Sequence, residues 1–80
     1  MEKKMQIIID EIMKELNRAT RLHPSWPTDI IHGAGIVCEE SGELIQAALN
    51  NIYLDGSKND IKKEAIHVAA TAIRFLRDSL

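Results

Sequence analysis

Residues 29–53, DIIHGAGIVCEESGELIQAALNNIY, decide the fold. Apolar residues recur there at helical spacing, without the alternation of a β-strand and without proline, so we expect one long α-helix. Thr28 or Asp29 can cap its start, and Asp55-Gly56-Ser57 ends it, because glycine readily adopts a left-handed conformation past a helix end. One broad apolar arc contains Ile30, Ala34, Val37, Leu44, Ala48 and Ile52, and Ile31, Cys38, Ile45 and Leu49 extend it.

Two further helices flank this one. The first spans about residues 2–21, and the third begins at Asn59 or Asp60 and ends near Asp78. Pro24 and Pro27 break the chain between the first two helices, since proline lacks an amide donor. The sequence therefore predicts a single all-α domain over residues 1–80 with three main helices. The apolar stripe of the first helix is Met5, Ile8, Ile9, Ile12, Met13 and Leu16.

The composition describes a small domain that needs help to be stable. With 80 residues, of which 45% are hydrophobic, the chain buries only about 60% of its unfolded surface. Cys38 is the single cysteine, so there is no disulfide framework, and its helical spacing favours a small core residue over a nucleophile. We therefore expect oligomerisation to complete a helix bundle, and a reducing cytoplasm fits the single thiol.

Charge and hydropathy argue against two classes of partner. The formal charge is −2, and no Lys/Arg cluster exceeds a pair such as Lys62-Lys63, so we expect no nucleic-acid polymer as partner. The longest uncharged stretch is far below the ~20 residues that a membrane span requires, so we expect no membrane partner.

Acidic residues repeat at a spacing that suits metal binding. Glu40 and Glu43 lie three residues apart, as do Glu64 and His67, so each pair shares one helix face. Glu40 lies among apolar positions on the helical wheel, whereas Glu43 lies toward Glu39 on a more polar side. We interpret Glu40 as an inward-facing ligand for a hard metal ion. Glu64 also borders apolar positions, whereas His67 is a second ligand, a hydrogen-bond partner or an ordinary exposed histidine.

These motifs resemble the MazG-like branch of the all-α nucleoside triphosphate pyrophosphohydrolases. The resemblance covers about residues 26–77 and rests on Glu40-Ser41-Gly42-Glu43-Leu44 followed by Glu64-Ala65-Ile66-His67, on successive helices after a Trp-containing turn. It implies a homodimer or dimer of dimers that hydrolyses a nucleoside triphosphate to the monophosphate and pyrophosphate. It also implies Mg²⁺ held by Glu40, Glu43 and Glu64.

His67 departs from that family pattern, because it stands where the family usually has aspartate. Mg²⁺ prefers oxygen ligands, whereas imidazole suits ions such as Mn²⁺, Fe²⁺, Ni²⁺ or Zn²⁺. Either the metal preference is altered, or three glutamates suffice, or activity is weakened or lost.

The sequence offers only a few candidate residues for catalysis and substrate binding. Glu39 or Glu43 could position or deprotonate the attacking water. Trp26 could stack on a base or anchor a core or interface. Lys62 and Arg74 are candidate substrate contacts.

Two other functions stay open. Glu64-x-x-His67 is the step used by di-iron carboxylate bundles, which a symmetric dimer could assemble with glutamates of the second helix. The non-enzymatic alternative is a helical dimerisation module in which the acidic residues are surface charge.

Overall fold

Three α-helices make up the chain in this computed structural model, which covers residues 1–80. They are α1 (Lys3–Leu22), α2 (Ile30–Tyr53) and α3 (Lys58–Ser79), and there are no strands. The predictions of an all-α fold and of three helices are confirmed, with boundaries within two residues of those expected.

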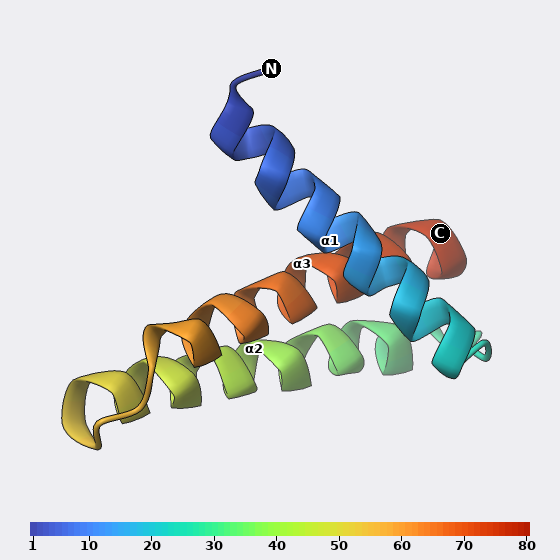
Figure 1. Cartoon of the computed structure of the whole chain (residues 1–80). Coiled ribbons are helices and arrows are strands. Elements are labelled where there is room, and N and C mark those ends of the chain that lie inside the picture. Colours follow the sequence, from blue (N-terminus) through green and yellow to red (C-terminus); the bar gives the residue numbers. More distant parts are fainter.

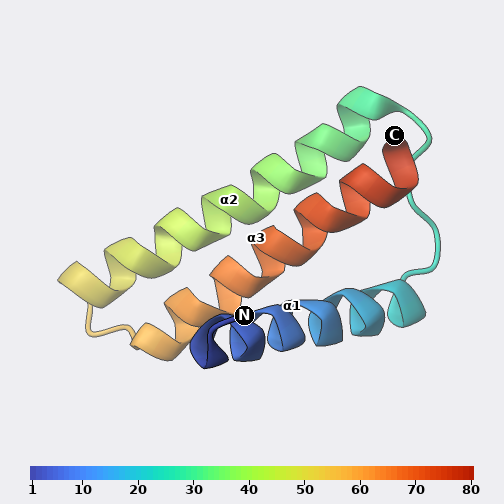
Figure 2. The ribbon, with the colours of Figure 1, turned by 90° about the horizontal axis from the view of Figure 1, so that it is seen from above.

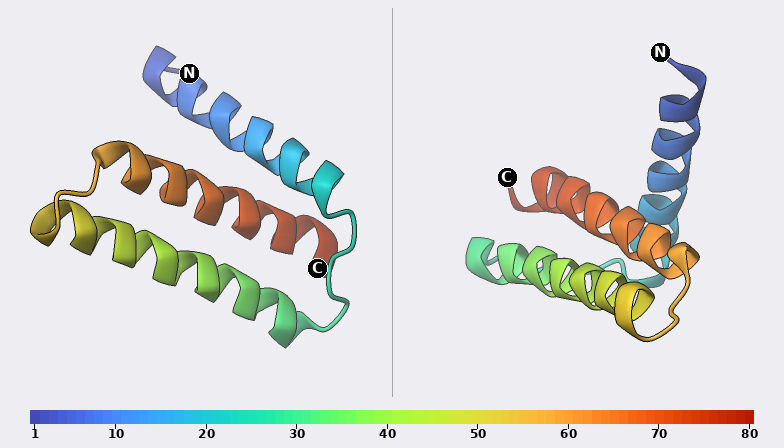
Figure 3. Two further views of the ribbon diagram at one scale, coloured as in Figure 1. Left: turned by 60° about the horizontal axis from the view of Figure 1, so that its bottom comes forward. Right: turned by 90° about the vertical axis from the view of Figure 1, so that its left-hand side faces the viewer.

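The third helix lies between the other two (Figure 2). α3 packs closely against both α1 and α2, whereas the backbones of α1 and α2 stay apart. α2 and α3 form an antiparallel hairpin, and α1 crosses α3 obliquely so that its amino-terminal half extends away from the hairpin (Figures 1 and 3). α3 is therefore the central helix, against which the other two helices pack.

The helix ends follow local chemistry, with two corrections. Asp29 is the N-cap of α2, where its carboxylate accepts hydrogen bonds from the Ile31 and His32 amides. α3 begins at Lys58, earlier than expected, because the Ser57 hydroxyl caps it by accepting from the Asp60 amide. The left-handed residue after α2 is Asp55, at φ 62°, and no glycine has positive φ. Aspartate tolerates that conformation.

Gly56 lets the backbone of the turn lie close to the end of α2, and it does not adopt a left-handed conformation. Its amide donates to the Asn50 carbonyl at 2.9 Å, and its carbonyl accepts from the Asn51 side-chain amide at 2.7 Å. A β-carbon at this position would lie 3.0 Å from the Asn50 backbone. The turn between α2 and α3 is thus folded back tightly on the end of α2.

Few apolar side chains are fully buried within one chain. The buried core consists of Leu16, Ala47 and Ala70, contributed by one helix each. The prediction that Cys38 is a core residue is wrong for the single chain, where Cys38 is exposed. The reason is geometric: α2 packs on α3 with one face only, so its opposite face is left uncovered.

Arg74 fastens the turn between α1 and α2 to α3. It is buried, and its guanidinium donates to the main-chain carbonyls of Ala19, His23 and Ser25. The same group lies 5.1 Å from the centre of the Trp26 ring, whose Nε1–H donates to Ser79 Oγ at 2.6 Å. This network joins the proline-containing turn to α3.

We expect Arg74→Met to destabilise the protein by about 3 kcal/mol, because a buried guanidinium that donates to three main-chain carbonyls is lost. Arg77→Met is the control: Arg77 is exposed and pairs with its neighbour Asp78, so its loss should cost less than about 1 kcal/mol. Urea unfolding followed by circular dichroism measures both. Equal losses for the two variants would contradict this role of Arg74.

Candidate metal centre

Side chains from all three helices meet around the imidazole of His67. Nδ1 of His67 lies 3.6 Å from Glu64 Oε2 and 4.0 Å from Glu40 Oε2. On the other side of the ring, Nε2 lies 3.6 Å from Glu15 Oε2. Glu64 and His67 come from successive turns of α3, Glu40 from the face of α2 that packs on α3, and Glu15 from α1. We call Glu15, Glu40, Glu64 and His67 the cluster.

Two carboxylate oxygens of the cluster are buried without a hydrogen-bond partner. Glu40 Oε2 and Glu64 Oε2 are inaccessible to solvent, and neither accepts a hydrogen bond. One ligand atom from each of Glu40, Glu64 and His67 can be chosen so that all three lie within 4.8 Å of one another. A buried, unpaired carboxylate oxygen is costly, so these atoms fit a site that binds a cation.

The ionisation of two members reflects their surroundings. Burial, reinforced by the charge of Glu43, raises the pKa of Glu40, against the attraction of His67. The hydrogen bonds that Arg18 donates hold the pKa of Glu15 below its ordinary value. Glu15 is thus a stabilised anion, whereas the charge of Glu40 is only partly compensated.

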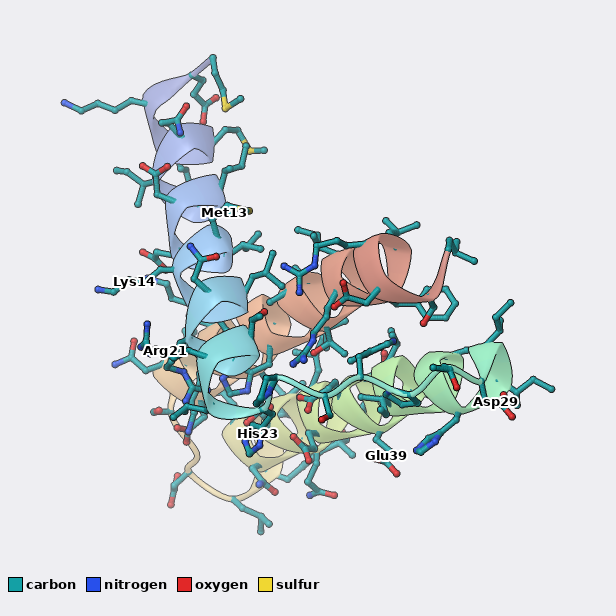
Figure 4. The ribbon with its side chains drawn as sticks, turned by 90° about the vertical axis from the view of Figure 1, so that its right-hand side faces the viewer. Met13, Lys14, Arg21, His23, Asp29 and Glu39 are labelled. Atoms are coloured by element: carbon teal, nitrogen blue, oxygen red, sulfur yellow. The ribbon has the colours of Figure 1, made fainter.

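The two remaining glutamates of the first motif differ in position. Glu43 is exposed, but it lies close enough to Glu40 to raise the pKa of that carboxyl, and with Glu64 it lines a cavity of about 310 Å³. Glu39 is exposed and points away from α3 (Figure 4). The structure therefore brings Glu40, Glu64 and His67 together, with Glu43 at the edge, and keeps Glu39 apart.

Glu15 belongs to the cluster but was not predicted from the sequence. It lies on the polar side of an amphipathic helix, and only the packing of α1 across α3 brings it to His67. The one local signal is its pairing with Arg18 three residues later, at 2.8 Å, which is common on exposed helices.

The candidate substrate contacts lie on two sides of the cluster. Trp26 and Arg74 line a cavity of about 230 Å³ that also reaches Glu15 and Glu40. Both are tied into the fold through the contacts described above, so Trp26 acts as an anchor in this chain. Lys62 lies on α3 toward the other side, where its ammonium group contacts Glu11 at 3.3 Å.

Fold and cluster together define an all-α protein with a carboxylate and histidine centre between its helices. Comparisons with protein-family models, with curated proteins and with solved structures find no match. None of the three helices has the length and apolar character needed to cross a membrane.

Glu40→Gln should stabilise the metal-free protein at neutral pH. Because the pKa of Glu40 is higher folded than unfolded, the folded protein binds its proton more tightly. Stability therefore falls as pH rises from the unfolded pKa through the folded one, and it stays low above it. Glu40→Gln does not lose stability in this way. It should therefore unfold at a higher denaturant concentration than the wild-type protein at pH 7.5 in EDTA, and the difference between the two should be smaller at pH 4.

The matched control for this measurement is Glu39→Gln, one position earlier on α2 with an exposed side chain. It should leave the unfolding midpoint nearly unchanged at both pH values. A Glu40→Gln variant that is no more stable than the control at pH 7.5 would refute the inference that the charge of Glu40 destabilises the folded protein.

Proposed function

We propose that this chain is a metal-dependent nucleoside triphosphate pyrophosphohydrolase that converts a ribo- or deoxynucleoside triphosphate to the monophosphate and pyrophosphate. The observation that carries the proposal is the pair of buried, unpartnered oxygens of Glu40 and Glu64 beside His67. We take the type of reaction from the resemblance of the motifs that contain these residues to the MazG-like family. A cytoplasmic location belongs to the same proposal.

The residues present fit a divalent ion. Two ligands of one ion at about 2.1 Å lie at most about 4.2 Å apart, and Nδ1 of His67 is 3.6 and 4.0 Å from the two glutamate oxygens. Glu15 can accept a hydrogen bond from Nε2–H after a small movement, which would hold Nδ1 unprotonated toward the centre. We propose Glu40, Glu64 and His67 as ligands, with Glu43 completing the set.

A bound Mg²⁺ or Mn²⁺ would neutralise phosphate oxygens and make phosphorus easier to attack. The chain's own residues have the other tasks. Glu43 is exposed at the edge of the cluster and can accept a proton from the attacking water, a role for which it is better placed than Glu39. The cavity that contains Trp26 and Arg74 is our candidate site for the nucleoside.

A symmetric dimer is part of the proposal. The exposed face of α2 carries a stripe of large apolar residues at seven-residue intervals: Ile31, Ile45 and Ile52 are 83%, 62% and 70% exposed, and Cys38 occupies the position between the first two. At 100° per residue, this stripe lies about 120° to 180° from Glu40 around α2. We call it the α2 seam. Covering it would leave both clusters of a dimer accessible.

The direct test is hydrolysis by the purified protein. It is incubated with a panel of nucleoside triphosphates and Mg²⁺ or Mn²⁺, and monophosphate and pyrophosphate are measured. We expect both products in equal amounts with at least one nucleotide. Formation of diphosphate and phosphate instead, or no reaction with any metal, would refute the proposal.

His67→Asp tests the metal preference. An aspartate adds a hard oxygen ligand, so the ratio of the Mg²⁺-dependent to the Mn²⁺-dependent rate should rise about tenfold. His32→Asp, at an exposed histidine on α2, should leave that ratio unchanged. An unchanged ratio in His67→Asp would show that His67 does not ligate the ion.

The di-iron alternative is distinguished by its assembly. It requires two Glu64-x-x-His67 steps to meet across a dimer, but a dimer formed through the α2 seam would place the two clusters on opposite sides of the paired α2 helices. Stoichiometric iron with a near-ultraviolet oxo-bridge band would favour the di-iron protein. A stable dimer that neither binds divalent ions nor hydrolyses nucleotides would favour the dimerisation module.

A further inference from the structure

A third cavity adjoins the cluster on the side away from Trp26. It has a volume of about 400 Å³ and lies between α1 and the first half of α3. Lys14 and Arg18 line it from α1, and Lys62 and Lys63 line it from α3. We call it the basic groove. In Figure 4, Lys14 extends from the same side of α1 as Arg21.

The basic groove has a positive balance in a chain whose formal charge is −2. Its four cations face two carboxylates, those of Glu11 and Glu15. Lys62 pairs with Glu11 at 3.3 Å and Arg18 with Glu15 at 2.8 Å, whereas Lys14 and Lys63 form no ion pair. Two ammonium groups are therefore free to bind an anion from opposite walls of the groove.

The groove ends at the cluster. Glu15 and His67 line the groove and also belong to the cluster, and Lys63 precedes Glu64 directly on α3. A ligand lying in the groove would therefore reach the candidate metal centre with one end. An anion of several linked charges fits this arrangement, because separate cations contact its tail while the centre holds its head.

We propose that the basic groove binds the polyphosphate tail of the substrate, with Lys14 and Lys63 as its principal contacts. The ligand class is a chain of two or more phosphates, as in a triphosphate tail or inorganic pyrophosphate. The inference rests on the proposed function for its role in hydrolysis. The binding itself does not depend on catalysis.

The probe is inorganic tripolyphosphate, titrated calorimetrically into the full chain in EDTA and again with Mn²⁺. Lys14→Met/Lys63→Met should weaken binding about tenfold or more under both conditions. The matched control is Lys4→Met/Lys58→Met, which removes the same charge from the same two helices outside the groove. It should change binding less than about threefold. Thermal unfolding verifies that both variants are folded.

Separate outcomes decide the two proposals. Tripolyphosphate binding that the groove variant weakens and the control does not would support the groove even if no nucleotide is hydrolysed. Where hydrolysis occurs, the groove variant should raise KM about tenfold with kcat within about threefold, and nucleoside monophosphate should bind both variants alike. Equal tripolyphosphate affinity in the groove variant and its control would overturn the inference.

Discussion

Glu64→Gln is expected to lower metal-dependent hydrolysis of the preferred nucleoside triphosphate by at least about a hundredfold. Gln keeps the size of the side chain but removes the negative charge of a carboxylate with a buried, unpartnered oxygen. The loss should appear mainly in kcat, with either Mg²⁺ or Mn²⁺. Glu2→Gln removes one glutamate charge from the exposed start of α1 and should retain full activity.

The same substitution should abolish stabilisation by metal. An ion at about one hundred times its dissociation constant stabilises the folded chain by about 2.7 kcal/mol, and this gain should disappear in Glu64→Gln. Thermal unfolding with and without Mn²⁺ measures it without reference to catalysis. A variant that keeps both its activity and its metal-induced stabilisation would show that the cluster is not the metal centre.

Ile45→Glu is expected to convert the proposed dimer into monomers at micromolar concentration. The substitution places a charge in the middle of the α2 seam, where burial without a partner costs several kcal/mol. Sedimentation equilibrium should show the mass of one chain, 9.0 kDa, instead of two. His32→Glu, on the polar side of α2, is the control and should remain dimeric. A wild-type protein that is itself monomeric would refute the proposal that the α2 seam is a dimer interface.

Two glycines make the seam testable in a second way. Gly35 and Gly42 lie within α2 near the seam, and nothing in the chain lies within 4 Å of a β-carbon added at either position. In a monomer, alanine at Gly42 should stabilise the helix by about 1 kcal/mol, because glycine is a poor helix former. If a partner helix packs closely there, Gly42→Ala should instead weaken the dimer. The sign of the change therefore reports whether the seam is covered.

The helices could be predicted from sequence, because apolar periodicity, prolines and capping residues act locally. Asp29 caps α2 as expected, and the wheel positions of Glu40 and Glu64 correctly indicated inward-facing carboxylates. The exposure of Cys38 could not be predicted in this way. Periodicity identifies an apolar face, but it does not show whether another helix covers that face.

The contacts between α1 and α3 were also beyond local patterns. Glu15 reaches His67, and Arg74 reaches carbonyls at and after the end of α1, across more than 45 residues of chain. Neither pair of contacts produces a periodic pattern in the sequence, so helical periodicity cannot predict them. Sequence alone therefore offers Arg74 as a candidate substrate contact and does not show that the backbone between α1 and α2 also binds its guanidinium.

The central position of α3 has a consequence for how the chain folds. Only four residues, 54–57, separate α2 from α3, so the hairpin forms by closing a short loop at a small cost in chain entropy. The backbone of α1 lies close to α3 and not to α2, so α1 gains most of its packing contacts only once α3 is in place. We infer that the hairpin forms first and α1 docks last, so the complete cluster, with Glu15 in place, is the final product of folding.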